Sequence, residues 1–284
     1  MDNNAGKTKD SEVACAKINL ALHVRKRLAN GYHELETVFA FVDCGDVLHV
    51  EPADTISLFV SGPFGDGLDN SSNLVAKAAE LLGHRFDVTR GAKLLLEKNL
   101  PIASGIGGGS ADAAAALRLL NRFWNLNLPA EKLATISASL GADVPACVMS
   151  RSCIGRGIGQ DLSFSQDRSL SGIPVLLINP LLPVSTPDIF KAWDGVDQGP
   201  LAGPDFLTMA LSGSNGLTKA AADLQPIISE ILNLLETTRP VMSRMSGSGA
   251  TCFGLYPSDE EREQAAAFLR RSAPDMWIMS GELK

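Results

Sequence analysis

The feature that most constrains this chain is a glycine-rich segment that leads directly into an alanine run, between Leu100 and Leu117. Four glycines fall within five positions there, at Gly105 and at residues 107–109. Glycine lets the backbone adopt positive φ and approach a ligand closely, whereas alanine is the best helix former. We therefore predict a tight loop that continues into a helix near Ser110. The unpaired N–H groups and the positive dipole end at such a junction suit an anion such as phosphate.

Two common nucleotide-binding loops do not match this segment. The P-loop requires a lysine after its last glycine, and no lysine follows the glycines here. The Rossmann fingerprint requires a third glycine where Ser110 stands, and an acidic residue about twenty positions further on. The nearby candidate, Glu131, lies in a helical pattern rather than at the end of a strand. A plain tight turn that packs a helix against a strand stays open as the alternative to a ligand-binding loop.

A family resemblance favours the ligand-binding loop. Residues 101–112 read Pro-Ile-Ala-Ser-Gly-Ile-Gly-Gly-Gly-Ser-Ala-Asp and resemble the signature Pro-x-x-x-Gly-Leu-Gly-x-Gly-Ser-Ser-x of the GHMP (galacto-, homoserine-, mevalonate- and phosphomevalonate-) kinases. They depart from it at Ile106, where leucine is usual, and at Ala111, where a second serine is usual. The resemblance implies that ATP binds here with Mg²⁺ and that Ser110 is the best protein ligand for that ion. The ATP-binding residues that it implies are Pro101, Ile102, Ala103, Ser104, Gly105, Ile106, Gly107, Gly108, Gly109, Ser110 and Ala111.

Composition and charge argue against several other classes of protein. The 284 residues are 45% hydrophobic and 20% charged, as in a soluble globular protein, and their number favours two domains. A net charge of −7 disfavours nucleic acid or a membrane surface as a partner. The five cysteines form no Cys-x-x-Cys pair, so neither a disulfide framework nor a zinc site is expected. We expect a cytoplasmic protein, because the polar first ten residues lack a secretory signal and no apolar run is long enough to span a membrane.

The hydrophobic pattern predicts a mixture of strands and helices in both halves of the chain. In a strand at residues 13–24, Lys17 and Asn19 share one face, and a polar strand face is ordinarily solvated. An antiparallel meander is expected from strands at residues 35–42, 47–51 and 55–60. Further strands are expected at residues 92–98, 153–160, 173–179, 241–245, 251–256 and 276–279. Helices are expected at residues 73–82, 110–123, 129–140, 187–193, 217–237 and 259–271, the one at 217–237 broken or kinked at Pro226.

A polar, serine-rich stretch at residues 163–172 predicts the boundary between two α+β domains. We place the N-terminal domain, with the glycine-rich loop, at residues 1–165 and the C-terminal domain at residues 166–284. Residues 1–10 read as a disordered leader.

Two segments near the N-terminus make the resemblance more specific. Residues 16–20, Ala-Lys-Ile-Asn-Leu, and residues 30–35, Asn-Gly-Tyr-His-Glu-Leu, look like the opening of the 4-diphosphocytidyl-2-C-methyl-D-erythritol kinase family. Homoserine and mevalonate kinases do not resemble the chain here. The resemblance implies an ATP-dependent kinase that phosphorylates the 2-hydroxyl of 4-diphosphocytidyl-2-C-methyl-D-erythritol (CDP-methylerythritol) in the non-mevalonate (MEP) isoprenoid pathway. A GHMP kinase that acts on a different small alcohol stays open as the alternative.

Two later segments resemble catalytic parts of these kinases. Residues 140–145, Leu-Gly-Ala-Asp-Val-Pro, look like the family's catalytic aspartate segment. The resemblance implies that Asp143 is the base on the acceptor hydroxyl and Lys17 its cationic charge partner. Taken alone, an aspartate between glycine and proline is ordinarily a turn residue. Residues 244–249, Arg-Met-Ser-Gly-Ser-Gly, resemble the C-terminal glycine motif that closes over the active site in this superfamily.

The resemblance also implies residues that bind the substrate. Asn19 is one, and the rings of Tyr32 and Phe190 are suited to stack on cytosine, as aromatic side chains do on bases. His33 is suited to hydrogen-bond the polar edge of that base. Packing in the core is the alternative for Tyr32 and Phe190.

The resemblance implies an α+β fold of two domains, the two-domain GHMP kinase fold, with the active site in the cleft between them. The N-terminal domain then has the β–α architecture of a ribosomal protein domain, and the C-terminal domain is ferredoxin-like α/β. We expect a monomer or weak homodimer whose partner is the small-molecule substrate CDP-methylerythritol. A non-enzymatic RNA-binding module is the third alternative, because of the shared ribosomal architecture. The net charge of −7 argues against RNA binding.

Overall fold

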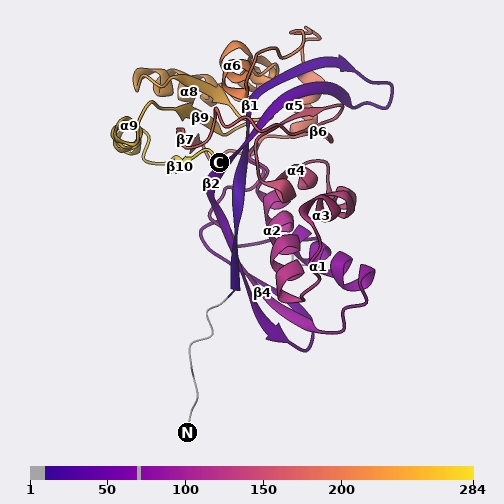
Figure 1. Cartoon of the computed structure of the whole chain (residues 1–284). Coiled ribbons are helices and arrows are strands. Elements are labelled where there is room, and N and C mark those ends of the chain that lie inside the picture. Colours follow the sequence, from indigo (N-terminus) through magenta and orange to yellow (C-terminus); the bar gives the residue numbers. More distant parts are fainter. Residues whose placement is uncertain (1–9, 69–71) are drawn as a thin grey trace. The chain divides into compact units, whose positions relative to one another are not determined.

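A computed structural model describes residues 10–68 and 72–284, so most of the predicted leader lies outside the described residues. The chain forms two compact units that alternate along the sequence (Figure 1). Of the described residues, the first unit comprises 10–14, 45–68, 72–100 and 109–149, and the second comprises Cys15–Cys44, Pro101–Gly108 and Ser150–Lys284. The predicted domain boundary after residue 165 divides the chain once, whereas each compact unit is built from three separate segments. The boundary between the family's two domains stays a prediction.

The sheet of the first unit includes three strands that lie in the order β3-β4-β2. The second half of β2 (His33–Ala53) pairs antiparallel with β4 (Gly91–Glu97), and β4 pairs parallel with β3 (Ile56–Ser61). The predicted antiparallel meander is therefore wrong, because β3 pairs with β4 and not with β2. β3 and β4 lie parallel because the chain returns between them through helix α1 (Leu74–Arg85), as parallel neighbours require. The strands predicted at residues 35–42 and 47–51 are one continuous strand, β2.

Helices lie along one face of this sheet (Figure 1). They are α1, α2 (Gly108–Phe123), α3 (Ala130–Ser137), the 3₁₀ turn Ala138–Leu140 and α4 (Val144–Met149). The alanines at residues 113–116 of α2 are completely buried, and their small side chains let the helix pack closely on its neighbours. The alanine run that predicts a helix in the sequence is thus also the part of α2 that lies in the core.

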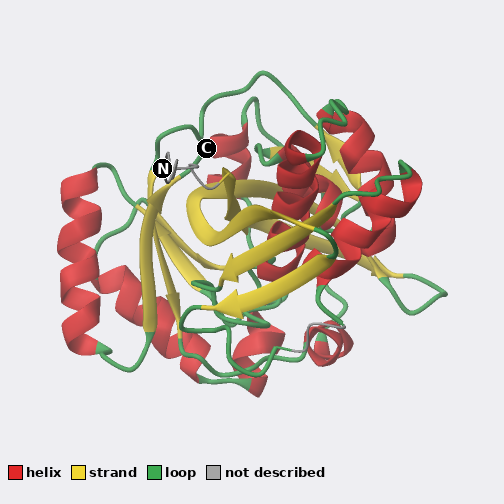
Figure 2. Cartoon of the chain, turned by 90° about the horizontal axis from the view of Figure 1, so that it is seen from below, coloured by secondary structure: helices red, strands yellow, loops and turns green. Residues whose placement is uncertain are grey.

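The second unit contains a four-stranded antiparallel sheet in the order β10-β7-β9-β8. Its strands are β7 (Pro174–Asn179), β8 (Met242–Met245), β9 (Cys252–Leu255) and β10 (Trp277–Glu282). Its helices are α5 (Thr186–Ala192), α6 (Phe206–Ser212), α7 (Thr218–Leu224), α8 (Ile227–Thr237) and α9 (Asp259–Ser272). This strand order, with α8 and α9 packed on the sheet, is the ferredoxin-like arrangement that the resemblance implies. Figure 2 shows helices and strands throughout the chain, and both occur in each unit, which confirms the α+β class.

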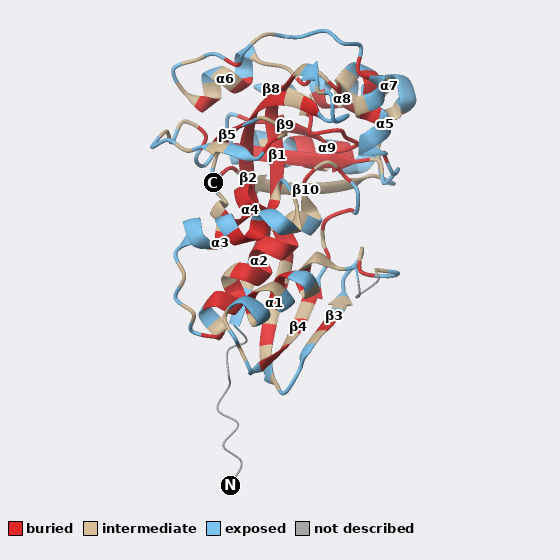
Figure 3. Cartoon of the chain, turned by 90° about the vertical axis from the view of Figure 1, so that its right-hand side faces the viewer, coloured by how far each residue is buried: buried red, intermediate tan, exposed pale blue. Residues whose placement is uncertain are grey.

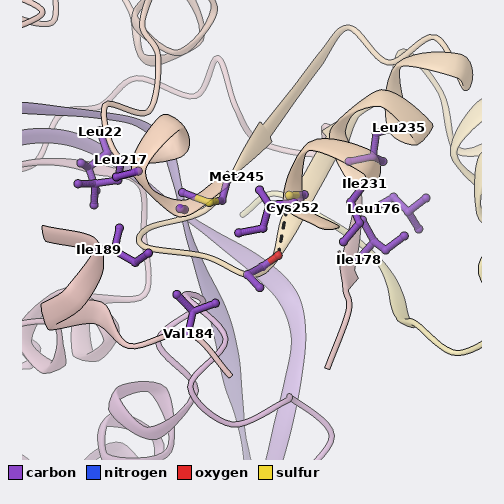
Figure 4. Packing of buried hydrophobic residues seen from close by; sticks show 14 of the residues in the cluster. Leu22, Leu176, Ile178, Val184, Ile189, Leu217, Ile231, Leu235, Met245 and Cys252 are labelled. Carbon is purple, nitrogen blue, oxygen red and sulfur yellow. Dashed lines mark hydrogen bonds between the residues drawn. The ribbon is translucent and has the colours of Figure 1, made fainter. Parts of the chain in front are cut away.

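The core of the second unit lies between this sheet and its helices. Leu176 and Ile178 of β7 face Ile231 and Leu235 of α8 (Figure 4). Leu22, from strand β1 (Asp10–Arg27), joins the same cluster. The N-terminal strand is therefore tied into the apolar core of a unit made mostly of C-terminal residues.

Strand β1 pairs with β2 and is buried along its length from Cys15 to Val24 (Figure 3). β2 also pairs with β5 (Cys153–Arg156), and β5 pairs with β6 (Asp161–Ser163). Lys17 is 5% exposed and Asn19 is 2% exposed. The expectation of a solvated polar face on this strand is wrong, because other segments of the second unit cover both side chains.

Candidate functional site

The glycine-rich segment folds as the predicted tight loop that continues into a helix. Ala103, Gly105 and Gly107 have positive φ of 51°, 78° and 65°, and α2 begins at Gly108. The first four N–H groups of an α-helix have no acceptor within the helix. The start of α2 therefore offers backbone donors together with the positive end of its dipole, which suits an anionic ligand.

The C-terminal glycine motif holds this loop in place within the second unit. The Ser246 hydroxyl donates to the carbonyl of Gly105 at 2.9 Å, and the Thr251 N–H donates to the carbonyl of Ser104 at 3.1 Å. A Cβ atom on Gly105 would lie 2.6 Å from the carbonyl oxygens of Ser246 and Gly249. Glycine is required at residue 105 both for its φ and for this close approach. The glycine-rich loop and the C-terminal glycine motif, which are far apart in the sequence, thus pack together as one structure.

Lys17 lies directly against the glycine-rich loop. Its backbone N–H donates to the carbonyl of Ile106 at 3.0 Å. A Cβ atom on Gly107 would lie 3.1 Å from Cε of Lys17, so the glycine leaves room for the lysine side chain. The Lys17 ammonium donates to Oδ1 of Asn19 at 3.2 Å and lies 5.0 Å from the centre of the Phe39 ring. The second unit therefore places a buried cation beside the predicted phosphate loop.

Asn19 connects Lys17 to two other segments. Its Nδ2 donates to the Thr37 hydroxyl at 2.8 Å, and Thr37 donates to the carbonyl of Ala21 at 2.6 Å. The Asn19 N–H donates to Oγ of Ser246 at 3.2 Å. Because the Asn19 side chain bonds to both Lys17 and Thr37, it orients the lysine. The contact of Asn19 with the substrate stays a prediction. Sequence reasoning missed Thr37, which carries no signal beyond being polar in an apolar strand.

The predicted aromatic residues meet at a cavity of about 600 Å³ in the second unit. Tyr32, His33 and Phe190 all line it, and Tyr32 is 59% exposed rather than packed in a core. The His33 and Phe190 ring centres lie 5.1 Å apart. Phe190 also packs against the apolar cluster of this unit, so it is a core residue that faces the cavity as well. The remaining lining residues are Arg27, Asn30, Gly31, Leu35, Ile158, Thr186, Pro187 and Lys191.

Arg27, which the sequence motifs did not single out, fixes the tautomer of His33 and lowers its pKa. Its Nε donates to Nε2 of His33 at 3.2 Å, so Nε2 is an acceptor and the ring proton sits on Nδ1. Burial lowers the pKa of His33, and the positive charge of Arg27 lowers it further. Arg27 also donates to the carbonyl of Lys191 at 3.2 Å. His33 is therefore held neutral, with one N–H that can donate a hydrogen bond.

A hydrogen bond links this cavity to the glycine motif. The hydroxyls of Thr186 and Ser248 lie 2.7 Å apart. Thr186 lines the cavity, and Ser248 belongs to the motif whose Ser246 holds the glycine-rich loop. The cavity, the motif, the loop residues 101–108 and Lys17 are thus parts of one connected arrangement in the second unit.

Other predicted site residues belong to the first unit. Gly109, Ser110 and Ala111 form the start of α2, where Ser110 is half-buried. Asp143 is half-buried in the turn before α4, and its carbonyl accepts from the N–H of Cys147 at 3.1 Å. The pairing of Asp143 with Lys17 stays a prediction. Helix α4 follows this turn where the sequence pattern predicts no helix.

Across residues 10–68 and 72–284, no group of three or more His, Cys, Asp or Glu side chains is arranged to hold a metal ion. The helices in this part of the chain include none with the length and apolarity needed to cross a membrane.

The sequence matches two known family descriptions. Residues 73–151 match "GHMP kinases N terminal domain", and residues 207–275 match "GHMP kinases C terminal". Two similar proteins, from Novosphingobium aromaticivorans and Sphingopyxis alaskensis, are both named 4-diphosphocytidyl-2-C-methyl-D-erythritol kinase. They are 50% and 46% identical to this chain over 96% of its length, which corresponds to 92% and 98% of theirs.

Solved structures show the same likeness. A crystal structure of 4-(cytidine 5'-diphospho)-2C-methyl-D-erythritol kinase has a TM-score of 0.78 and 32% identity, covering 96% of this chain and 98% of that one. A homoserine kinase from Cytophaga hutchinsonii has a TM-score of 0.72 over 99% of this chain and 98% of its own. At 15% identity, the second likeness concerns the fold alone.

Proposed function

This chain belongs to the GHMP kinases and, among them, to the family of the 4-diphosphocytidyl-2-C-methyl-D-erythritol kinases, and we propose that it phosphorylates the 2-hydroxyl of CDP-methylerythritol with ATP. The product would serve the non-mevalonate isoprenoid pathway. The observation that carries the proposal is the connected arrangement in the second unit. There, Thr186 and Ser248 join the aromatic cavity to the motif that holds the glycine-rich loop.

We assign the ATP phosphates to the loop and the start of α2. The N–H groups at residues 108–111 supply donors, and positive φ at Gly105 and Gly107 lets the backbone come close to the phosphates. Lys17 lies beside Gly107 and supplies a cation for the charge that develops during phosphoryl transfer. Asn19 orients Lys17 through the hydrogen bond between its Oδ1 and the lysine ammonium.

The residues present fit Mg²⁺ carried on the ATP phosphates. Mg²⁺ binds oxygen ligands and commonly takes only one or two of them from a nucleotide-binding protein, with the phosphates completing its shell. The Ser110 hydroxyl, at the start of α2, is a suitable oxygen donor. When bound, the ion neutralises negative charge on the phosphates being transferred. Ser110 would hold it close to the N–H groups of the loop.

We assign the acceptor hydroxyl to Asp143 as base, with Lys17 as its cationic charge partner. The support is the family's aspartate segment at residues 140–145 and the half-buried position of Asp143 in a turn. A carboxylate is a weak base. Phosphoryl transfer tolerates a weak base, because its loose transition state depends mainly on positioning and charge stabilisation.

We assign the cytosine to the cavity lined by Tyr32, His33 and Phe190. The rings of Tyr32 and Phe190 offer stacking surfaces, which are worth about 1–3 kcal/mol per base. The Nδ1–H of neutral His33 can donate to an acceptor on the polar edge of the base. A cavity of about 600 Å³ lies in the range of small-ligand sites.

An ADP-release assay with a panel of acceptors tests the proposal. We expect turnover with CDP-methylerythritol and little with the unlinked methylerythritol phosphate, homoserine or mevalonate, because only the first presents a cytosine to the cavity. Equal turnover of the unlinked sugar phosphate would contradict the assignment of the cavity. Preference for homoserine or mevalonate would favour a GHMP kinase that acts on a different small alcohol.

Replacement of Asp143 tests the base. For Asp143→Ala we expect kcat to fall by roughly 10²–10⁴-fold, the usual contribution of a positioned acid or base, with little change in ATP affinity. Steady-state kinetics with CDP-methylerythritol, together with calorimetric titration of an ATP analogue, measure both quantities. A variant that turns over at near the parent rate would show that Asp143 is not the base.

A further inference from the structure

A buried ionic network lies in the first unit, outside the residues assigned above. The ammonium of Lys98 donates to Oδ2 of Asp46 on β2 and, at 2.7 Å, to Oδ2 of Asp112 on α2. Lys98 is 4% exposed, Asp46 is completely buried and Asp112 is 4% exposed. Taking three charged groups out of water is costly, so their hydrogen bonds must offset a large desolvation penalty.

The network joins the two ends of the phosphate-binding loop. Oδ1 of Asp46 accepts from the backbone N–H of Asn99 at 2.6 Å and of Leu100 at 2.8 Å. These residues immediately precede the loop at 101–111, and Asp112 immediately follows it. Lys98 bridges the carboxylate at the entry of the loop to the carboxylate at its exit.

We propose that Asp46, Lys98 and Asp112 are positioning residues that set the two ends of the loop for ATP. This inference rests on the ATP site of the proposed function. Holding the ends of a loop in place removes the freedom that would otherwise be lost when the phosphates bind. The network thereby prepares the loop's backbone donors before the nucleotide arrives.

The chemistry of the network supports positioning over simple stabilisation. Replacing a buried ion pair by well-packed apolar residues is often neutral or stabilising, so such a network is weak evidence for a role in stability. Apolar packing has no preferred direction, whereas charge-assisted hydrogen bonds are short and directional. Lys98, held by the carboxylates of Asp46 and Asp112, fixes the distance between β2 and α2. Apolar side chains in the same place would allow a wider range of distances.

Two variants of Asp112 separate positioning from stability. Asp112→Ala removes the link at the loop exit but leaves Lys98 paired with Asp46, so one positive and one negative charge remain. We therefore expect the variant to fold with a melting temperature close to that of the parent. Asp112→Asn keeps an oxygen that can accept from Lys98 and should preserve the link.

Two further variants serve as controls. Leu117→Ala opens a cavity under the completely buried part of α2 and lowers stability without removing a network hydrogen bond. Lys93→Met removes an ion pair with Glu51, 3.1 Å long, further along the β2–β4 pairing. Both controls should bind nucleotide as the parent does.

The measurement is calorimetric titration with a non-hydrolysable ATP analogue and Mg²⁺, together with amide hydrogen exchange at residues 101–111. For Asp112→Ala we expect the affinity to fall by roughly tenfold or more and the loop amides to exchange faster. Asp112→Asn should keep most of the parent's nucleotide affinity and most of the slow amide exchange in the loop. Parent-like affinity and exchange in Asp112→Ala would overturn the inference, as would an equal loss of affinity in Leu117→Ala.

The inference and the proposed function can fail separately. Nucleotide titration requires no acceptor, so a parent protein that binds the analogue but does not phosphorylate CDP-methylerythritol would overturn the acceptor assignment alone. If the parent binds the analogue and phosphorylates CDP-methylerythritol, and Asp112→Ala matches it in both, the positioning role alone fails.

Discussion

Two buried lysines show how differently the two units use a positive charge. Lys17 of the second unit lies against Gly107 of the glycine-rich loop and donates to the amide of Asn19. Lys98 of the first unit donates to the carboxylates of Asp46 and Asp112. Both lysines are about 95% buried, so burial alone does not identify the one that meets a ligand. The segment that each lysine lies against identifies its role.

The charge state of Lys98 follows from its neighbours. Burial would lower the pKa of Lys98, but Asp112 and Asp46 raise it above its usual value, so the ammonium stays charged. We therefore assign Lys98 to holding chain segments together. Lys17 is assigned to the phosphates because it borders the loop that resembles a phosphate site.

Removing Lys98 should have the largest effect on stability. Lys98→Met leaves two buried carboxylates without their cation, and breaking a buried pair in this way costs about 3–5 kcal/mol in the free energy of unfolding. Urea denaturation of this variant against the parent measures the loss. Lys17→Met in the same experiment should lose much less, and an equal loss in both variants would show that the two lysines contribute alike to stability.

Removing Lys17 should instead have the larger effect on the rate. Loss of one positioned donor to a transition-state charge typically costs about 2.7–4 kcal/mol, so we expect kcat of Lys17→Met to fall by roughly 10²–10³-fold. The measurement is kcat with saturating ATP and CDP-methylerythritol, at a temperature where the variant is fully folded. A kcat within a few-fold of the parent would remove Lys17 from the reaction.

Exchanging the partner of Lys17 sharpens the contrast. Asn19→Asp would give Lys17 a carboxylate, as Lys98 has, at a position where the present hydrogen bond is 3.2 Å long. The added negative charge would compete with phosphate for the ammonium, and we expect kcat to fall by roughly tenfold, or about 1.4 kcal/mol. Asn19→Ser serves as the neutral control, and a larger loss in the serine variant would point to packing rather than charge.

The smallest effect concerns Arg27, a third cation, which bonds to the neutral ring of His33. Burial and then Arg27 lower the pKa of His33, so the stability that its neutral ring contributes is fully present above the usual pKa of 6.5 and is lost as the pH falls from 6.5 through the lowered pKa of the folded protein. In Arg27→Met the pKa of His33 should rise toward 6.5, while burial still holds it lower. Titration of the His33 ring by NMR gives the shift, and an unchanged pKa would show that Arg27 does not act on it.

The sequence predicts the parts of this molecule whose cause is local. The glycine-rich loop and the alanines of α2 follow from the backbone freedom of glycine and the helix propensity of alanine. Pro226 separates α7 from α8, as its missing N–H predicts. The class of the fold, its family and the aromatic residues at the cavity were likewise available from motifs and their spacing.

Pairings between distant segments lie beyond this kind of reasoning. Alternation in β3 and β4 predicts strands but says nothing of their parallel pairing. The burial of Lys17 depends on a loop some ninety residues away in sequence. The pattern of its own strand therefore predicts, wrongly, that one face of the strand is exposed to solvent. No pattern links Asp46 to Lys98 and Asp112, because the contact between them arises only when the sheet and α2 come together.

The position of the new phosphate on the reaction product decides whether the chain is the proposed kinase. The protein is incubated with Mg²⁺, ATP and CDP-methylerythritol, and the phosphorus NMR spectrum of the product is recorded with coupling to the methylerythritol carbons. We expect one new phosphomonoester, on the oxygen at carbon 2, with the cytidine diphosphate intact. A phosphate on any other hydroxyl, or ADP formed without a phosphorylated sugar, would contradict it.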